Sequence, residues 1–240
     1  MGRLALVAGH SFLGAEAALP FAGEARAVEV STRNGTVRAL DGGNLVLLQR
    51  HGFDAHRPAH LIDHQANLMA LRELGCDRVL AVASVGSLRV ELGVGAIVCP
   101  DDFIAPQLGI SVFDDLRGHL VPGFDREWRR RVLAAWPGGG APREGGVYWQ
   151  SIGPRFETPA EVRMIAAHAD VVGMTVASEC VVAGELGIAY AALCAVDNLA
   201  NGLGDAPLGH AELAAAREAN RASLASALEA VAATLAGEAA

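Results

Sequence analysis

The sequence predicts one α/β domain, with a mixed, mostly parallel central sheet flanked by helices. Short apolar runs rich in Val, Leu and Ala alternate with amphipathic stretches along the 240 residues. The runs are continuously apolar, which is typical of strands that are buried on both faces of a sheet. No internal repeat and no long linker divides the chain, so we expect residues 1–240 to form a single domain.

The first half of the chain is expected to be rich in strands. Asn34-Gly35 predicts a tight hairpin and Asp41-Gly42-Gly43 a second turn, so residues 27–52 should contain two or three strands. Apolar residues at helical spacing predict a helix over 63–76, which Gly75 ends. Further strands are expected over 3–9, 77–88 and 96–105.

The second half alternates helices and strands. Residues 137–142 (PGGGAP) are a loop, and Thr158-Pro159 is a plausible helix start. Helices are expected over 125–136, 159–169, 177–187 and 210–237, and strands over 145–153, 170–175 and 188–198.

Composition and charge exclude several classes of protein. The chain is 52% hydrophobic and 19% charged, and its formal net charge is −8. A surface for nucleic acid or for an anionic membrane is therefore not expected, because it would need a basic patch. All 19 basic residues counted as Lys or Arg are Arg, which excludes a Schiff-base lysine and a Walker-type phosphate lysine.

Cysteine usage and hydropathy predict a soluble, cytoplasmic protein. The four cysteines lie far apart and lack metal-ligand spacing, so we interpret Cys76, Cys99, Cys180 and Cys194 as core residues in a reduced cytosol. The sequence reaches an apolar run already at residue 3, without the basic region and cleavage site of a secretion signal. We therefore expect this run to be a first strand rather than a signal peptide. No charge-free apolar stretch reaches about 18 residues, so no transmembrane helix is expected.

Polar side chains follow the predicted strands, where ligands of open α/β sheets gather. One set combines an Arg-His pair with hydroxyl groups, which is what an oxyanion such as phosphate requires. Its members are Ser11, Arg50, His51, Ser84 and Thr175. A second set offers apolar surface, one carboxylate and one amide, which suits a heterocyclic base. Its members are Phe156, Glu157, Met174 and Asn198.

Each of these features also has a structural explanation. The Gly-rich turn GHSFLG (9–14) is not a dinucleotide fingerprint, and Arg50-His51 could be a surface pair. Gly153-Pro154 is turn chemistry, and Asp197-Asn198 could cap the last strand. Only their joint arrangement at successive strand ends indicates a ligand site.

Several of these segments resemble one known family. RHG (50–52) precedes QANLMALRELGC (65–76), and GSL (86–88) follows. The chain then continues with GPRFET (153–158), GMT (173–175) and the terminal-strand Asn198. Over nearly its full length, it is similar to the trimeric purine nucleoside phosphorylases and methylthioadenosine phosphorylases. The resemblance implies that a purine nucleoside is cleaved by phosphate, giving the free base and a ribose 1-phosphate, with phosphate as co-substrate and neither metal nor organic cofactor.

The resemblance also implies roles for the residues. Arg50, Glu157 and Asn198 would carry the catalysis, and Ser11, His51, Ser84 and Thr175 would join Arg50 in holding phosphate. Phe156 would pack on the purine and Met174 would lie under the ribose. His119 would serve the 5′ pocket of a neighbouring subunit in a homotrimer, and His210 could close that pocket. Taken alone, each of these histidines is more often an ordinary surface residue.

The Glu157 and Asn198 pair predicts the base. A 6-oxopurine has an N1–H donor and an O6 acceptor, which a carboxylate and an amide can meet, whereas a 6-aminopurine reverses both. Members that act on adenosine-type substrates generally carry Asp in place of Asn198 and lack the Glu157 equivalent. A mismatch would leave buried polar groups unpaired, at about 1–3 kcal/mol each. We therefore expect substrates like methylthioinosine, inosine or guanosine.

The chain departs from the family pattern in two places. The usual phosphate turn is Gly-Thr/Ser-Gly-Leu, but here His10 and Phe12 flank Ser11, so Phe12 could narrow the pocket and His10 could add a donor. Asp63 and His64 stand where the methylthionucleoside enzymes commonly have Asn and Tyr. The alternatives are methylthioadenosine phosphorolysis, nucleoside hydrolysis, or purine-nucleoside binding without turnover.

Overall fold

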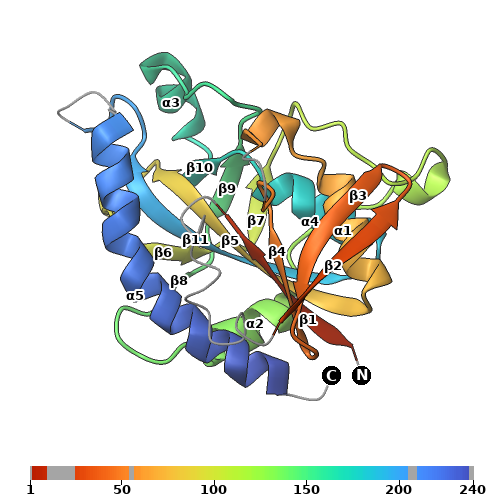
Figure 1. Cartoon of the computed structure of the whole chain (residues 1–240). Helices are drawn as coiled ribbons and strands as arrows, with labels where there is room; N and C mark the ends of the chain where they lie inside the picture. The colour runs from red at the N-terminus through yellow and green to blue at the C-terminus, as the bar shows by residue number, and fades with distance from the viewer. Residues whose placement is uncertain (1, 10–24, 54–56, 205–209, 238–240) are drawn as a thin grey trace.

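A mixed sheet organises the fold in the computed structural model, which describes residues 2–9, 25–53, 57–204 and 210–237 (Figure 1). The strands are β1 Arg3–Ala8, β2 Arg26–Thr32, β3 Gly35–Asp41, β4 Leu45–Gln49, β5 Cys76–Ser87, β6 Ile97–Cys99, β7 Asp102–Ile104, β8 Arg143–Glu144, β9 Val147–Gln150, β10 Val171–Gly173 and β11 Ala189–Leu199. The helices are α1 His64–Glu73, α2 Arg126–Ala134, α3 Pro159–Ile165, α4 Val176–Glu185 and α5 His210–Gly237, with short 3-10 helices η3 Ala59–Leu61 and η4 Leu116–Gly118. The expected single α/β domain is confirmed.

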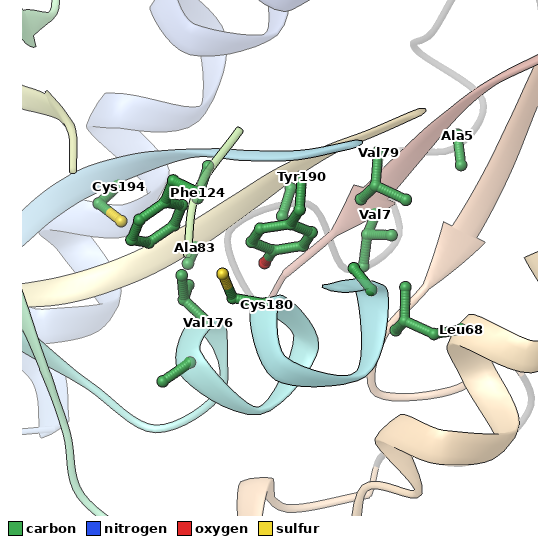
Figure 2. Packing of buried hydrophobic residues seen from close by; sticks show 14 of the residues in the cluster. Ala5, Val7, Leu68, Val79, Ala83, Phe124, Val176, Cys180, Tyr190 and Cys194 are labelled. Atoms are coloured by element: carbon green, nitrogen blue, oxygen red, sulfur yellow. The ribbon is translucent and has the colours of Figure 1, made fainter. Parts of the chain in front are cut away.

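Helices cover both faces of the sheet, as alternation along β1 shows. Ala5 and Val7 pack in one apolar cluster with side chains of α1 and α4. Leu4 and Leu6 point the other way and pack with side chains of α2 and α5. Figure 2 shows part of the first cluster, with Val176 and Cys180 on α4 facing the sheet. Because successive strand residues point to opposite faces, an apolar strand needs a covering layer on each side.

The central strand β5 creates a fork in the sheet. Along one edge it pairs in parallel with β11, from Arg78 to Ser87. On the other edge it pairs in parallel with β1 as far as Ala81, and antiparallel with β10 from Gly86. Among the described residues, no strand is registered against residues 82–85 on this second edge. The gap between β1 and β10 leaves room for a ligand beside the middle of a buried strand.

One of the predicted strands is wrong. Residues 96–105 form two short strands that leave in different directions: β6 pairs with β11 and β8, and β7 pairs with β9. Pro100 lies between them, and proline has no N–H to donate to a sheet. The two-residue strand β8 was not expected, whereas the other strands and helices are confirmed within a few residues of their ends.

The described residues also bear on the expected core and on membrane crossing. All four cysteines are free and buried, which confirms them as core residues. Burial raises the pKa of the Cys76 and Cys180 thiols to about 12, so they stay protonated at neutral pH. Within the part of the chain described, none of the helices has the length and apolarity to span a bilayer.

Candidate active site

A cavity of about 230 Å³ opens at the fork of the sheet. It is lined by Ala83, Ser84, Val85 and Gly86 of β5, next to the residues that follow β4, β10 and β11. Eight of the residues that the sequence singled out come together there: Arg50, His51, Ser84, Phe156, Glu157, Met174, Thr175 and Asn198. Arg50 and His51 follow β4, and Asn198 lies near the end of β11, so the parallel strands bring these three to one edge. Strand β10 runs antiparallel to β5, and the residues after it, Met174 and Thr175, therefore lie back toward Ser84 in the middle of β5.

Arg50 lies on the wall of this cavity but is almost completely buried, with 2% of its surface exposed. Its Nε and Nη2 atoms donate to the two carboxylate oxygens of Glu179, and the Nη2–Oε2 distance is 2.9 Å. Its Nη1 donates to the Val82 carbonyl at 2.9 Å. Burial alone would lower the pKa of Arg50, but the Glu179 carboxylate raises it above the ordinary value. Arg50 therefore remains a cation in a fixed orientation.

Gly9 gives Arg50 the space that it occupies. A Cβ atom at position 9 would lie 2.6 Å from Arg50 Nη1 and 2.6 Å from the Val82 carbonyl oxygen. Both distances are shorter than any normal contact to carbon, so a side chain here would displace the guanidinium or strand β5. The glycine that ends the first apolar run is thus required by close approach.

His51 is held by its own loop. Its Nδ1 lies 2.7 Å from the Arg57 carbonyl oxygen. Because a carbonyl can only accept, Nδ1 carries the proton, and this contact fixes the ring orientation at the cavity wall.

The start of helix α4 leaves the Thr175 hydroxyl available. Thr175 is the N-cap residue, yet its side chain makes no capping hydrogen bond. Instead, Tyr148 Oη of β9 accepts from the backbone N–H groups of Thr175 and Val176, at 3.2 and 3.4 Å. Gln150 Oε1 accepts from Ser178 N–H at 3.1 Å. Since strand β9 satisfies these helix donors, Thr175 can present its hydroxyl to the cavity.

The cavity is also lined by the side chains expected for a base. Phe156 is 40% exposed and lies next to Glu157 in the loop after β9. In the described part of the chain, no hydrogen bond occupies the Glu157 carboxylate, while its carbonyl accepts from Asn201 Nδ2 at 3.2 Å. Asn198 Nδ2 donates to the Leu199 carbonyl at 2.8 Å, which leaves one N–H and the amide oxygen of Asn198 for a ligand.

Met174 reaches the cavity because Gly153 lacks a side chain. Gly153 has a φ of +74°, and a Cβ atom there would lie 2.6 Å from Met174 Sδ. The glycine of GPRFET is therefore fixed both by its backbone angle and by this contact.

Three of the expected residues are not among the described residues that line this cavity. Ser11 lies outside the described residues, as do His10 and Phe12 of the same turn, and the side chain of His210 is not described. His119 is exposed at the end of η4, away from the cavity lining. Their assigned roles stay predictions. Within the described ranges, no group of three or more His, Cys, Asp or Glu side chains could hold a metal ion.

Comparison with known proteins decides the family. A sequence model described as the phosphorylase superfamily matches residues 3–233. The chain belongs to this superfamily. Among curated relatives, a probable 6-oxopurine nucleoside phosphorylase of Archaeoglobus fulgidus is 38% identical over 183 residues, covering 74% of each chain. A probable S-methyl-5′-thioinosine phosphorylase of Methanothermobacter thermautotrophicus is 36% identical, over 69% of this chain and 59% of the relative.

Solved structures agree on the phosphorylase fold. Methylthioadenosine phosphorylase from Schistosoma mansoni, in complex with adenine, superposes with a TM-score of 0.85. It covers all of this chain and 93% of that one, at 21% sequence identity. The family resemblance inferred from the motifs is confirmed.

Sequence reasoning missed several residues at this cavity or behind it. Asn201 lines the cavity, and Glu179 and Tyr190 lie buried behind Arg50. Asp197, considered from the sequence only as a strand cap, also lines the cavity. A signal for Glu179 did exist, because it is the one charged residue in the stretch 176–183, where Ser178 is the only hydroxyl or amide side chain. A carboxylate in an apolar helix that packs on a sheet needs a buried cation, and Arg50 directly follows an apolar strand.

Proposed function

We propose that this chain is a purine nucleoside phosphorylase that prefers 6-oxopurines, such as methylthioinosine, inosine or guanosine. One observation carries the proposal. A cation and hydroxyl groups (Arg50, Ser84, Thr175) and a ring, carboxylate and amide (Phe156, Glu157, Asn198) line a single cavity. This arrangement suits phosphate on one side of a sugar and a purine on the other.

The reaction breaks the bond between C1′ of the sugar and N9 of the purine. The electron pair of this bond goes to the purine, and a phosphate oxygen forms the new bond to C1′. In the transition state the sugar is positive and the base negative, so catalysis needs an anion near C1′ and donors at the base. Arg50 would hold the phosphate by charge, and Asn198 would donate to the departing base.

The contacts at the base would select the 6-oxo group. Glu157 would accept from N1–H, and the remaining N–H of Asn198 would donate to O6. For a 6-aminopurine, N1 has no hydrogen and the exocyclic group donates, so the carboxylate would face a lone pair. The relatives support this preference, because the curated proteins compared above are named for 6-oxopurine nucleosides and methylthioinosine.

Base release tests the proposal. The protein is mixed with methylthioinosine, inosine and methylthioadenosine, each with and without phosphate, and free base is measured by chromatography. We expect release from the 6-oxopurine substrates that depends on phosphate. Release without phosphate would indicate a hydrolase, preference for methylthioadenosine would reverse the base assignment, and tight binding without release would indicate a binding protein.

We further propose a homotrimer that acts in the cytoplasm. Leu116 and Val121 are 79% and 97% exposed on the segment that carries His119, and a neighbouring subunit that took up His119 would cover both apolar side chains. The four free, buried thiols suit a reducing compartment. Light scattering measures the mass of the assembly, and a monomer at micromolar concentration would contradict the trimer.

A further inference from the structure

Behind Arg50 lies a group of buried polar side chains from three other elements. Glu179 on α4 is completely buried, and Tyr190 on β11 and His64 on α1 are nearly so. Both oxygens of the Glu179 carboxylate accept hydrogen bonds from buried donors. Oε1 accepts from Arg50 Nε and lies 3.7 Å from His64 Nδ1, while Oε2 accepts from Arg50 Nη2 and from Tyr190 Oη, the latter at 2.7 Å.

From strand β11, the Tyr190 hydroxyl donates a hydrogen bond to the Glu179 carboxylate. Figure 2 shows its hydroxyl pointing toward α4, the helix that carries Glu179. Burial raises the pKa of Tyr190 well above its ordinary value, and the neighbouring Glu179 charge adds to this effect. The hydroxyl therefore keeps its proton and remains a donor to Glu179. Tyr190 itself is fixed in the core, where its ring packs 6.0 Å from that of Phe124.

Glu179 determines which donors of Arg50 remain for a ligand. Arginine has five N–H groups in one rigid plane. Glu179 takes two of them and the Val82 carbonyl takes a third. Among the described residues, nothing else accepts from Arg50, so one N–H remains on each terminal nitrogen. Because the guanidinium is planar, two bonds to one carboxylate fix the direction of the other donors.

We propose that Glu179 is the positioning residue of the phosphate site: it orients Arg50 for phosphate, and the Tyr190 hydroxyl holds it in place. Neither residue lines the cavity, so both act through Arg50. The inference rests on the proposed phosphorolysis. It also explains a charged pair in the core, since a buried ion pair by itself adds little stability but fixes geometry.

The test separates phosphate from nucleoside. Glu179→Gln keeps the shape of the side chain but removes its charge. Its amide NH₂ group would then face an N–H of Arg50 or the O–H of Tyr190, where the carboxylate oxygen accepts a hydrogen bond. We expect the KM for phosphate to rise about tenfold or more, in line with loss of a charged hydrogen-bonded partner, while the KM for methylthioinosine changes less than twofold. Tyr190→Phe, which removes only the hydroxyl that donates to Glu179, should raise the KM for phosphate about threefold. The matched control is Asp41→Asn, which breaks an Arg–carboxylate pair with Arg3 at the end of β1 remote from the cavity and should leave both KM values unchanged.

The outcomes are decisive in each case. An unchanged phosphate KM in Glu179→Gln overturns the inference, as does an equal rise of both KM values, which would indicate a general structural defect. Should Glu179→Gln fail to fold, Tyr190→Phe decides by the same criterion. Calorimetric titration with inorganic phosphate keeps the two proposals apart. If the wild-type protein releases no base, the proposed function fails, and weaker phosphate binding by the variants still supports the positioning role.

Discussion

Asn198 is the residue on which the proposed base preference depends. The Leu199 carbonyl accepts one N–H of the amide, so the other N–H and the amide oxygen are left for a ligand. Asn198→Asp would replace the donor by an acceptor and favour a 6-amino group. We expect the ratio of kcat/KM for methylthioadenosine over methylthioinosine to rise about tenfold or more, as for exchange of one matched hydrogen bond. Asn44→Asp, on an exposed turn, is the matched control, and an unchanged ratio in Asn198→Asp would contradict the assignment.

Substitution of Gly9 tests whether Arg50 and strand β5 need the space that this glycine leaves. Gly9→Ala would force carbon into contact with Arg50 and Val82, and we expect it to destabilise the fold by about 1–3 kcal/mol and to weaken phosphate binding. Gly109→Ala is the control, because no atom lies within 4 Å of the added carbon, and it should stay within about 0.5 kcal/mol of wild type. Urea unfolding measures both variants. Equal stability of the two would show that the site relaxes freely.

Helix α4 depends on strand β9 for the hydrogen bonds at its N-terminus. Tyr148→Phe removes the oxygen that accepts from Thr175 and Val176 and leaves both N–H groups buried without that acceptor. We expect a loss of about 1–3 kcal/mol in the free energy of unfolding. For comparison, Thr158→Ala removes the capping box of the partly exposed helix α3 and should cost about 1 kcal/mol. A smaller loss for Tyr148→Phe than for Thr158→Ala would contradict this account.

The elements were largely predictable, and the reason lies in their patterning. The β2–β3 hairpin forms where Asn34-Gly35 predicts one, although its two turn residues are Arg33 and Asn34 and Gly35 already begins β3. Thr158-Pro159 begins α3 as expected. The separation of β6 from β7 was not predictable from a continuous apolar run, because their divergence depends on partners β11 and β9 elsewhere in the chain. For the site, the motifs identified side chains that line the cavity. They did not include Tyr190 or Glu179, because neither lines the cavity and both contact Arg50 or each other only in the folded chain. The one sequence signal for Glu179, a charge within an apolar helix, indicates a buried partner but does not say which one.

At the scale of the whole molecule, the buried pair couples folding to pH. Burial opposes ionisation of Glu179, but Arg50 outweighs it and lowers the pKa of this carboxyl from 4.5 to about 2. A depressed carboxyl pKa stabilises the folded state above the unfolded value, and this contribution is lost as pH falls from 4.5 toward 2. We therefore expect the stability difference between wild type and Glu179→Gln to be constant from pH 7 to about 5 and to shrink below it. Urea unfolding at pH 7, 5, 4 and 3 measures the difference, and a gap that widens in acid would contradict the pairing.

The fork at β5 has an evolutionary consequence. Residues that would contact the anion lie just after β4 and at the start of α4. Residues that would contact the purine lie in the loop after β9 and near the C-terminal end of β11. Mutations in the loop after β9 or at the end of β11 can thus change which nucleobase is accepted while the reaction itself is preserved. On such a scaffold, substrate specificity can diverge between related enzymes while the catalytic mechanism stays the same.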